Sequence, residues 1–160
     1  KGMADQIVVH NRSNNWDNEA FRATMIAVDQ ANIIRNQHGD TSQFKFTTDM
    51  REALEGAEIV VVTAGVARKS PTQPRSELLA LNCGVIDPIA HTAREVAPNA
   101  SYIIATNPVD AMAQRFQEQS GIDASRILGL SGELDRARMV QSISNQAQVA
   151  PGRVQNAQVI

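Results

Sequence analysis

Two arginines in one loop are the residues whose type and spacing point most directly to chemistry. Arg68 and Arg75 flank the stretch KSPTQP, just after the apolar run EIVVVT and the small residues Ala64 and Gly65. A guanidinium stays charged and can donate two parallel hydrogen bonds to a carboxylate. The loop is therefore predicted to close over an anionic substrate. The alternative is a solvated connection with a charged rim.

Polar residues also follow two other expected strands. Asn11, Arg12 and Ser13 come after the run QIVVH, and Asn107 comes after the run SYIIAT. In a doubly wound sheet, ligands bind at the carboxyl ends of the strands. Three polar sets at strand ends therefore indicate a ligand site along one edge of the sheet.

Strand-like and helix-like segments alternate along the chain, which predicts an α/β fold of βαβ units with a parallel sheet. Strands are expected at 6–10, 44–48, 58–63, 101–106, 126–130 and 153–160, and helices at 16–35, 49–57, 76–98, 107–121 and 132–149. The run 58–63 is expected to be buried on both faces. Asn107 is expected to cap the helix that ends at Gly121, with Pro108 at its first position, and Pro88 to kink the longest helix.

Composition argues against several classes of partner. The 160 residues carry a net charge of −2, so no general attraction to nucleic acid or to a membrane surface is expected. Cys83 is the only cysteine, so it can form neither an internal disulfide nor a zinc site of paired cysteines. We expect no bound metal and a reducing compartment, the cytoplasm.

Three stretches, VVVTAGVARK, IATNPVDAM and GLSGELDRAR, together resemble the NAD(P)-dependent malate/lactate dehydrogenase family, and the match runs from about Ala4 to the last residue. The resemblance implies a Rossmann-like doubly wound parallel sheet that is incomplete at its N-terminus and runs into the start of the substrate domain. Residues 1–106 would be part of the dinucleotide-binding domain. Residues 107–160 would be the end of that domain and the start of the catalytic domain.

The resemblance also implies roles for the matching residues. Arg68 would bind the second carboxylate of the substrate, Arg75 would polarise the reacting carbonyl, and Arg138 would hold the carboxylate beside the reacting carbon. Asp135 would orient the catalytic histidine. Asn107 would lie near substrate and nicotinamide, and its bond to Pro108 is a candidate cis peptide. The positions implied to contact the cofactor are Asn11, Arg12, Ser13, Gly65, Asn82, Ala105, Thr106 and Asn107.

Each of these residues has a simpler explanation when it is considered alone. Asp135 and Arg138 could form an ordinary ion pair three residues apart on a helix. Asn107 could serve only as a helix cap. The combined pattern, and no single residue, favours the functional interpretation.

An arginine at position 68 resembles malate dehydrogenases, whereas lactate enzymes usually carry glutamine there. The resemblance therefore implies reversible hydride transfer between NAD(P) and malate or oxaloacetate, in the tricarboxylic acid cycle, by a homodimer or homotetramer that binds a small dicarboxylate. The arginine loop is one residue longer than is usual, and SPTQP replaces the common Pro-Gly turn. The alternatives are a lactate or other 2-hydroxy acid dehydrogenase, and a catalytically incomplete nucleotide-binding scaffold.

The residues after the first strand bear on the cofactor, which is NAD or NADP. NAD-binding domains usually place Asp or Glu at this strand end, to bind the ribose hydroxyls. Here the sequence reads Asn11, Arg12 and Ser13, which could accept a 2′-phosphate, so NADP is favoured over NAD.

Two parts of the family pattern fall outside this sequence. The strand with the glycine-rich turn is expected before Lys1, and the catalytic histidine beyond Ile160. His10, His38 and His91 do not match the histidine's motif. Without that strand, the runs QIVVH and EIVVVT would each lose a neighbour and expose hydrogen-bonding edges. The segment alone is expected to be inactive.

Overall fold

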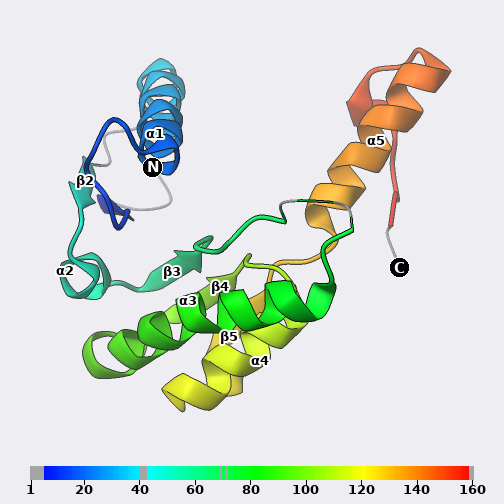
Figure 1. Cartoon of the computed structure of the whole chain (residues 1–160). Coiled ribbons are helices and arrows are strands. Elements are labelled where there is room, and N and C mark those ends of the chain that lie inside the picture. The colour runs from blue at the N-terminus through cyan, green and yellow to red at the C-terminus, as the bar shows by residue number, and fades with distance from the viewer. Residues whose placement is uncertain (1–5, 40–42, 69, 71, 159–160) are drawn as a thin grey trace. The chain divides into compact units, whose positions relative to one another are not determined.

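The computed structural model describes residues 6–39, 43–68, 70 and 72–158, and the side chains of Gln43, Arg75, Glu133 and Leu134 also lie outside the described part. The chain divides into two compact units, Lys1–Ala57 with Thr92–Pro98, and Glu58–His91 with Asn99–Ile160 (Figure 1). Strands and helices alternate, and all the described strand pairs are parallel. The predicted Rossmann-like α/β fold is confirmed.

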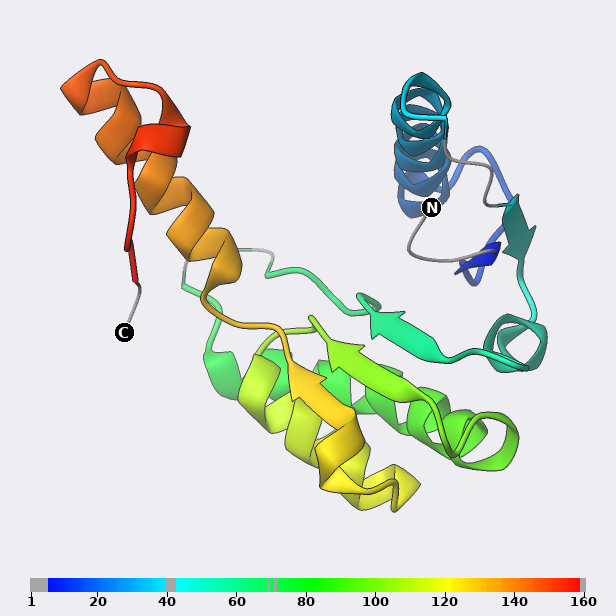
Figure 2. The same ribbon diagram turned by 180° about the vertical axis from the view of Figure 1, so that it is seen from behind.

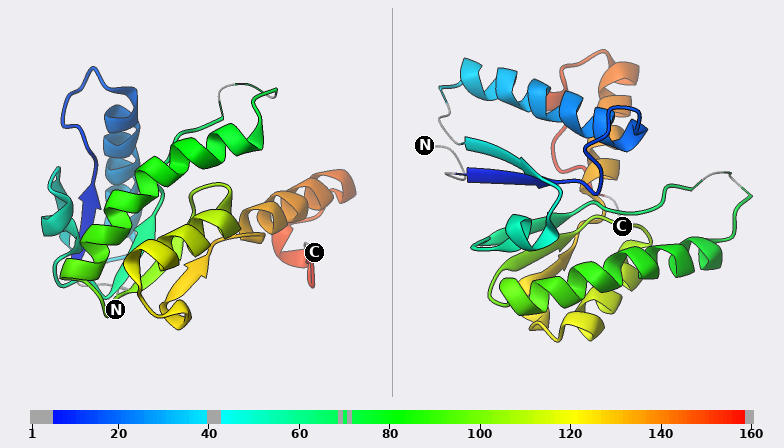
Figure 3. Two further views of the ribbon diagram at one scale, coloured as in Figure 1. Left: turned by 60° about the horizontal axis from the view of Figure 1, so that its bottom comes forward. Right: turned by 60° about the vertical axis from the view of Figure 1, so that its left-hand side comes forward.

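The first unit contains two strands and two complete helices. They are β1 (Gln6–His10), α1 (Glu19–Gln37), β2 (Gln43–Thr47) and α2 (Met50–Leu54). β1 pairs with β2 in register from Gln6 opposite Gln43 to His10 opposite Thr47. Figure 3 (right) shows α1 lying along one side of this strand pair.

An aromatic cluster fixes the start of α1. The ring of Phe21, 5% exposed, packs edge-on against Trp16 at 5.2 Å and Phe46 at 5.3 Å between centroids. The side chain of Asn18 caps the helix by accepting a hydrogen bond from the Phe21 N–H at 3.0 Å. The helix therefore begins at Glu19, whereas the apolar spacing predicted a start at Trp16.

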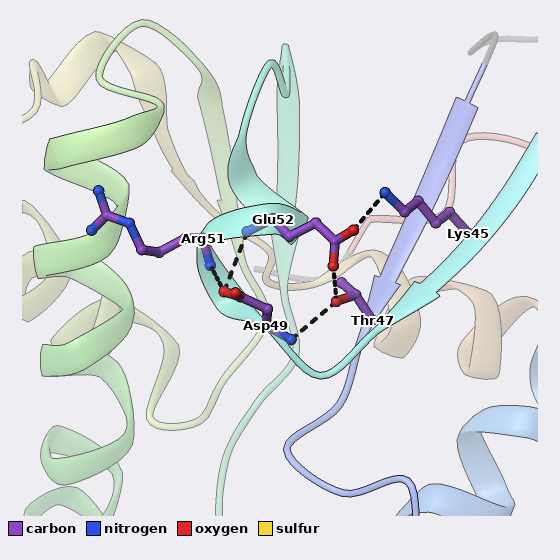
Figure 4. Close-up of polar contacts among 5 residues, drawn as sticks. All are labelled: Lys45, Thr47, Asp49, Arg51 and Glu52. Atoms are coloured by element: carbon purple, nitrogen blue, oxygen red, sulfur yellow. Dashed lines mark hydrogen bonds and ion pairs between the residues drawn. The ribbon is translucent and has the colours of Figure 1, made fainter.

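A polar network joins the end of β2 to the short helix α2 (Figure 4). Asp49 caps α2 by accepting from the Arg51 N–H at 2.8 Å and the Glu52 N–H at 3.4 Å. Thr47, 7% exposed, donates to the Glu52 carboxylate, and Lys45 pairs with the same carboxylate at 2.6 Å. These bonds hold the pKa of Glu52 below its usual range, chiefly through Lys45 and then Thr47. The network turns the chain sharply at the carboxyl end of β2.

The second unit is built on a three-stranded parallel sheet. Its elements are β3 (Ile59–Val62), α3 (Arg75–Val96), β4 (Ser101–Ile104), α4 (Val109–Ser120), the 3-10 turn η1 (Ala124–Arg126), β5 (Ile127–Gly129), α5 (Glu133–Ala147) and the 3-10 turn η2 (Pro151–Arg153). The strand order is β3-β4-β5. The last turn of α3 belongs to the first unit. Figure 2 shows the strands in front, with α3 and α4 together behind them.

The core of the second unit lies between this sheet and its two helices. Tyr102 of β4 is 1% exposed, and its ring lies 4.8 Å from that of Phe116 on α4. Ile86 of α3, Ile104 of β4 and Phe116 are fully buried. Burial of side chains of this size is the main source of stability for such a layer. Burial also raises the pKa of Tyr102 to about 12.

The prediction that 58–63 is buried on both faces is wrong for the described unit. Successive side chains of a strand point to opposite faces of the sheet. Val62 faces the helices and is 4% exposed, whereas Ile59 is 65% exposed and Val61 56% exposed. Leu128 of β5, which shares the outer face, is 59% exposed. Since α3 and α4 cover the same face, the opposite face of this sheet stays apolar and accessible.

Each unit has its own sheet. Among the described residues, β1 pairs with β2 alone and β3 with β4 alone, so β1 and β3 are edge strands there. No helix in the described part of the chain is long and apolar enough to cross a membrane.

Two local predictions need correction. α4 begins at Val109 with Pro108 as its cap residue and no side-chain cap bond, so Asn107 does not cap it and Pro108 precedes its first helical position. The strand expected at 153–160 is not formed over 153–158: Arg153 ends η2, and 154–158 pair with no strand in the described residues. The stop at Gly121, with φ +66°, and the cis bond between Asn107 and Pro108 are both confirmed.

Candidate functional site

The carboxyl ends of β3 and β4 meet in a group of partly buried contacts, here called the strand-end cluster. It consists of Gly65, Asn82 and Thr106 with the backbone of Val66 and Asn107. The Thr106 hydroxyl donates to the Ala64 carbonyl at 2.7 Å, and the Ala105 N–H donates to the Val62 carbonyl at 2.9 Å. The two loops that follow these strands are thereby held side by side.

Asn82 is the centre of the cluster. It projects from α3 and is 1% exposed. Its Oδ1 accepts from the Val66 N–H at 2.7 Å, while its Nδ2 donates to the Asn107 carbonyl at 2.7 Å and to the Val66 carbonyl at 3.4 Å. A backbone N–H can only donate and a carbonyl can only accept, so the orientation of the amide is determined. One side chain therefore connects both loops to the helix.

Gly65 lies where the two loops pass closest. A Cβ at this position would lie 2.7 Å from Cγ2 of Thr106 and 3.3 Å from Oδ1 of Asn82. The first distance is far below van der Waals contact, so a side chain here would displace Thr106. The other side of Gly65 is exposed. Its bare backbone can therefore be approached from solvent, as a nucleotide phosphate or ring requires.

The arginine loop leaves this cluster at Val66. The exposed side chain of Arg68 donates through Nε and Nη2 to the Gln73 carbonyl, at 3.2 and 2.8 Å. These bonds link Arg68 to the backbone of Gln73. Arg75 is the first residue of α3, but its side chain, and Lys69 and Pro71 in the loop, lie outside the described residues.

The polar set after β1 belongs to the first unit. Asn11 donates through Nδ2 to the Thr24 hydroxyl of α1 at 3.1 Å and accepts from the Ser13 N–H at 3.2 Å. The Ser13 hydroxyl oxygen accepts from the Asn15 N–H at 3.1 Å. Arg12 is exposed at the turn. The amide of Asn11 therefore shapes the turn, and Arg12 is the charged group that the turn presents.

Asp135 and Arg138 lie near the start of α5 and pair with each other. Arg138 Nη1 is 3.1 Å from Asp135 Oδ1, and their side chains are 69% and 64% exposed, respectively. This is the ordinary helix pair that the spacing alone also predicted, and an exposed pair of this kind stabilises a helix by only about 0.3–0.5 kcal/mol. Either group can therefore leave its partner for a ligand at little cost.

The structure thus brings together only part of the predicted site. Gly65, Asn82, Thr106 and Asn107 meet at the strand-end cluster, with Ala105 half-buried beside them. The connecting role of Asn82 was missed by sequence reasoning, which took it as a cofactor contact. One signal was available, since Asn82 stands alone as a polar residue in the apolar stretch LLALNCGVI, where a buried amide needs specific partners.

A second feature that the sequence did not reveal is the contact between α3 and α4. Arg115 donates through Nε and Nη2 to the two carboxylate oxygens of Asp87, at 2.8 and 2.7 Å. This two-pronged bond from Arg115 holds the pKa of Asp87 below its usual range. It ties α3, which carries Asn82, to α4, which follows Asn107.

The chain is similar in sequence to one known family of proteins. Residues 17–129 match the family described as lactate/malate dehydrogenase, NAD binding domain. A malate dehydrogenase of Caldivirga maquilingensis is 40% identical over 113 residues, which cover 71% of this chain and 36% of that protein. The chain thus spans about a third of the length of that relative.

Solved structures show the same fold. The malate dehydrogenase of Aeropyrum pernix has a TM-score of 0.73 at 30% identity, with 92% of this chain and 45% of that one covered. The lactate dehydrogenase of Cryptosporidium parvum, in complex with lactic acid and nicotinamide adenine dinucleotide, has a TM-score of 0.73 at 27% identity, with 94% and 44% covered.

Proposed function

The chain belongs to the lactate/malate dehydrogenase family through its NAD-binding domain, and we propose that the protein is an NAD(P)-dependent malate dehydrogenase. Two kinds of finding support this. Relatives named malate dehydrogenase are 40% and 41% identical to it. The chain also carries Arg68 where the resemblance places the group that selects the substrate.

The position of Arg68 is the observation that carries the proposal. It is exposed on the loop that leaves the strand-end cluster, two residues beyond the Val66 backbone that Asn82 holds. A guanidinium there can pair with the second carboxylate of oxaloacetate, which pyruvate lacks. The bonds of Asn82 to the Val66 backbone hold the start of the loop in place, so the position from which Arg68 extends is fixed.

The remaining residues take the roles that the resemblance assigns. Arg138 holds the carboxylate next to the reacting carbon after leaving Asp135, and Arg75 polarises the carbonyl. Asp135 orients a proton-accepting histidine that is expected beyond Ile160. Asn107, whose side chain stays exposed beside the cluster, adjoins the substrate.

The carboxyl edge of β3 and β4 fits a nicotinamide cofactor, because the bare backbone of Gly65 is open to solvent there. The bound cofactor supplies C4 as hydride donor or acceptor for C2 of the substrate. Ala105, Thr106 and Asn107 lie along the same edge. The family description and the Cryptosporidium parvum complex name NAD. The choice of NADP rests on Asn11, Arg12 and Ser13, of which Arg12 alone is charged, and remains a prediction.

We further propose a cytoplasmic homodimer or homotetramer. The single cysteine supports a reducing compartment. The assembly is what the resemblance implies for members of this family.

Replacing Arg68 by Gln in the full-length gene product tests the assignment. We expect kcat/KM for oxaloacetate to fall by about a hundredfold or more, because the second carboxylate loses its charged partner, while cofactor affinity changes little. Arg153→Gln, an exposed arginine on η2, is the matched control and should leave both unchanged. Equal losses of oxaloacetate turnover and cofactor affinity in Arg68→Gln would count against the assigned role.

A further inference from the structure

We propose that Asn82 is a positioning residue that sets the spacing of the two substrate-side loops, and not a cofactor contact. The role of the two loops in binding substrate rests on the proposed function. The contacts of Asn82 with them are observed in the structure and do not depend on it.

The first observation is that Asn82 has no surface to offer a ligand. Its side chain is 1% exposed, and both amide hydrogens and the carbonyl oxygen already bond to backbone groups. A cofactor contact would require one of these bonds to break. A buried backbone group would then be left without a partner, which is costly.

The second observation is what the partners are. Val66 lies two residues before Arg68, and Asn107 is itself a predicted substrate contact. Val66 N–H and Asn107 C=O are loop groups beyond the ends of β3 and β4, so the sheet does not fix them. The bonds from Asn82 do so instead, at 2.7 Å each.

The third observation is that other bonds already hold the bases of the same two loops together. The Thr106 hydroxyl donates to the Ala64 carbonyl at 2.7 Å, and the Ala105 N–H donates to the Val62 carbonyl at 2.9 Å. Loss of the Asn82 bonds would therefore release Val66 and Asn107 without separating the strand ends. The distance between Arg68 and Asn107 would then no longer be fixed.

Three variants separate the possible roles. Asn82→Leu keeps the size of the side chain and removes all its hydrogen bonds. Asn82→Asp keeps the acceptor for the Val66 N–H but loses the amide donor to Asn107. Ile86→Val trims a fully buried side chain one turn along α3, outside the cluster, and controls for a general loss of stability.

Amide hydrogen exchange in the full-length protein gives a readout that does not depend on activity. The Val66 N–H should exchange about tenfold faster in Asn82→Leu than in Ile86→Val, because only the first substitution removes its hydrogen bond to Asn82. In Asn82→Asp that N–H should stay protected. If Asn82→Leu does not fold, Asn82→Ser, too short to reach Val66, takes its place. Unchanged exchange at Val66 would overturn the proposal.

Kinetics then test the link to function. Asn82→Asp should raise KM for oxaloacetate and lower kcat, while the dissociation constant of NADH, measured by its fluorescence, stays within about twofold. A loss confined to NADH affinity would instead make Asn82 a cofactor contact and sink the proposal. If the protein turned over no 2-oxo acid, the proposed function would fail, yet the exchange experiment would still decide whether Asn82 holds the loops.

Discussion

Replacing Gly65 by Ala places a methyl group where the loops after β3 and β4 pass closest. The added Cβ would lie 2.7 Å from Cγ2 of Thr106, so one of the two must move. Thr106 is 4% exposed and its hydroxyl is bonded to the Ala64 carbonyl at 2.7 Å, so it cannot turn away without breaking that bond. Forcing a methyl group into a packed site of this kind costs about 1–3 kcal/mol.

The assay is urea unfolding of the full-length protein, followed by far-ultraviolet circular dichroism. We expect the free energy of unfolding to fall by about 1–3 kcal/mol in Gly65→Ala, with the slope against urea unchanged. Gly84→Ala is the matched control, since a Cβ there meets no atom within 4 Å and the position is helical. That change should stabilise the protein by about 0.5–1 kcal/mol.

A double variant identifies the clash itself. Thr106→Ser removes Cγ2 but keeps the hydroxyl, so Gly65→Ala with Thr106→Ser should recover most of the lost stability. If Gly65→Ala were as stable as the unchanged protein, or if Thr106→Ser gave no recovery, the close packing of the two loops would be refuted.

Three further predictions concern the cofactor and the ionisable groups. Arg12→Ala should raise the KM for NADPH more than that for NADH, and an unchanged ratio would refute the choice of NADP. Asp87→Asn should lower stability at neutral pH and flatten its acid dependence: the folded-state pKa of Asp87 lies below its unfolded value, so its contribution is present above about pH 4 and is lost as pH falls further. Equal acid dependence of both proteins in urea unfolding would contradict this. Burial raises the pKa of Tyr102 from 10.0 to about 12, so its contribution is complete below pH 10 and is lost as pH rises toward 12. Tyr102→Phe should therefore reduce the loss of stability between pH 10 and pH 12. An unchanged fall in the free energy of unfolding over that range would count against this prediction.

The fold was predictable because its signals are local. QIVVH coincides with β1, and the helix that stops at Gly121 ends there because glycine adopts a positive φ without strain. The alternation of strands and helices then leaves a parallel sheet as the arrangement to expect. Boundaries were less certain where a cap decides them, as Asn18 does for α1.

Burial and contacts between distant residues could not be predicted in the same way. The run EIVVVT looks buried on both faces, yet its burial depends on which elements cover the sheet, and α3 and α4 cover one face. Asn82 and its partner Asn107 are 25 residues apart, and their bond forms only because the strand ends meet. Sequence could place both residues near the site but could not say that one holds the other.

The ratio of kcat/KM for oxaloacetate to that for pyruvate, measured with NADH on the full-length protein, tests the central claim most directly. The account predicts that oxaloacetate is preferred by about a hundredfold or more, because only it carries the second carboxylate that Arg68 can bind. Equal turnover of the two acids, or a preference for pyruvate, would contradict a malate dehydrogenase whose specificity resides in Arg68.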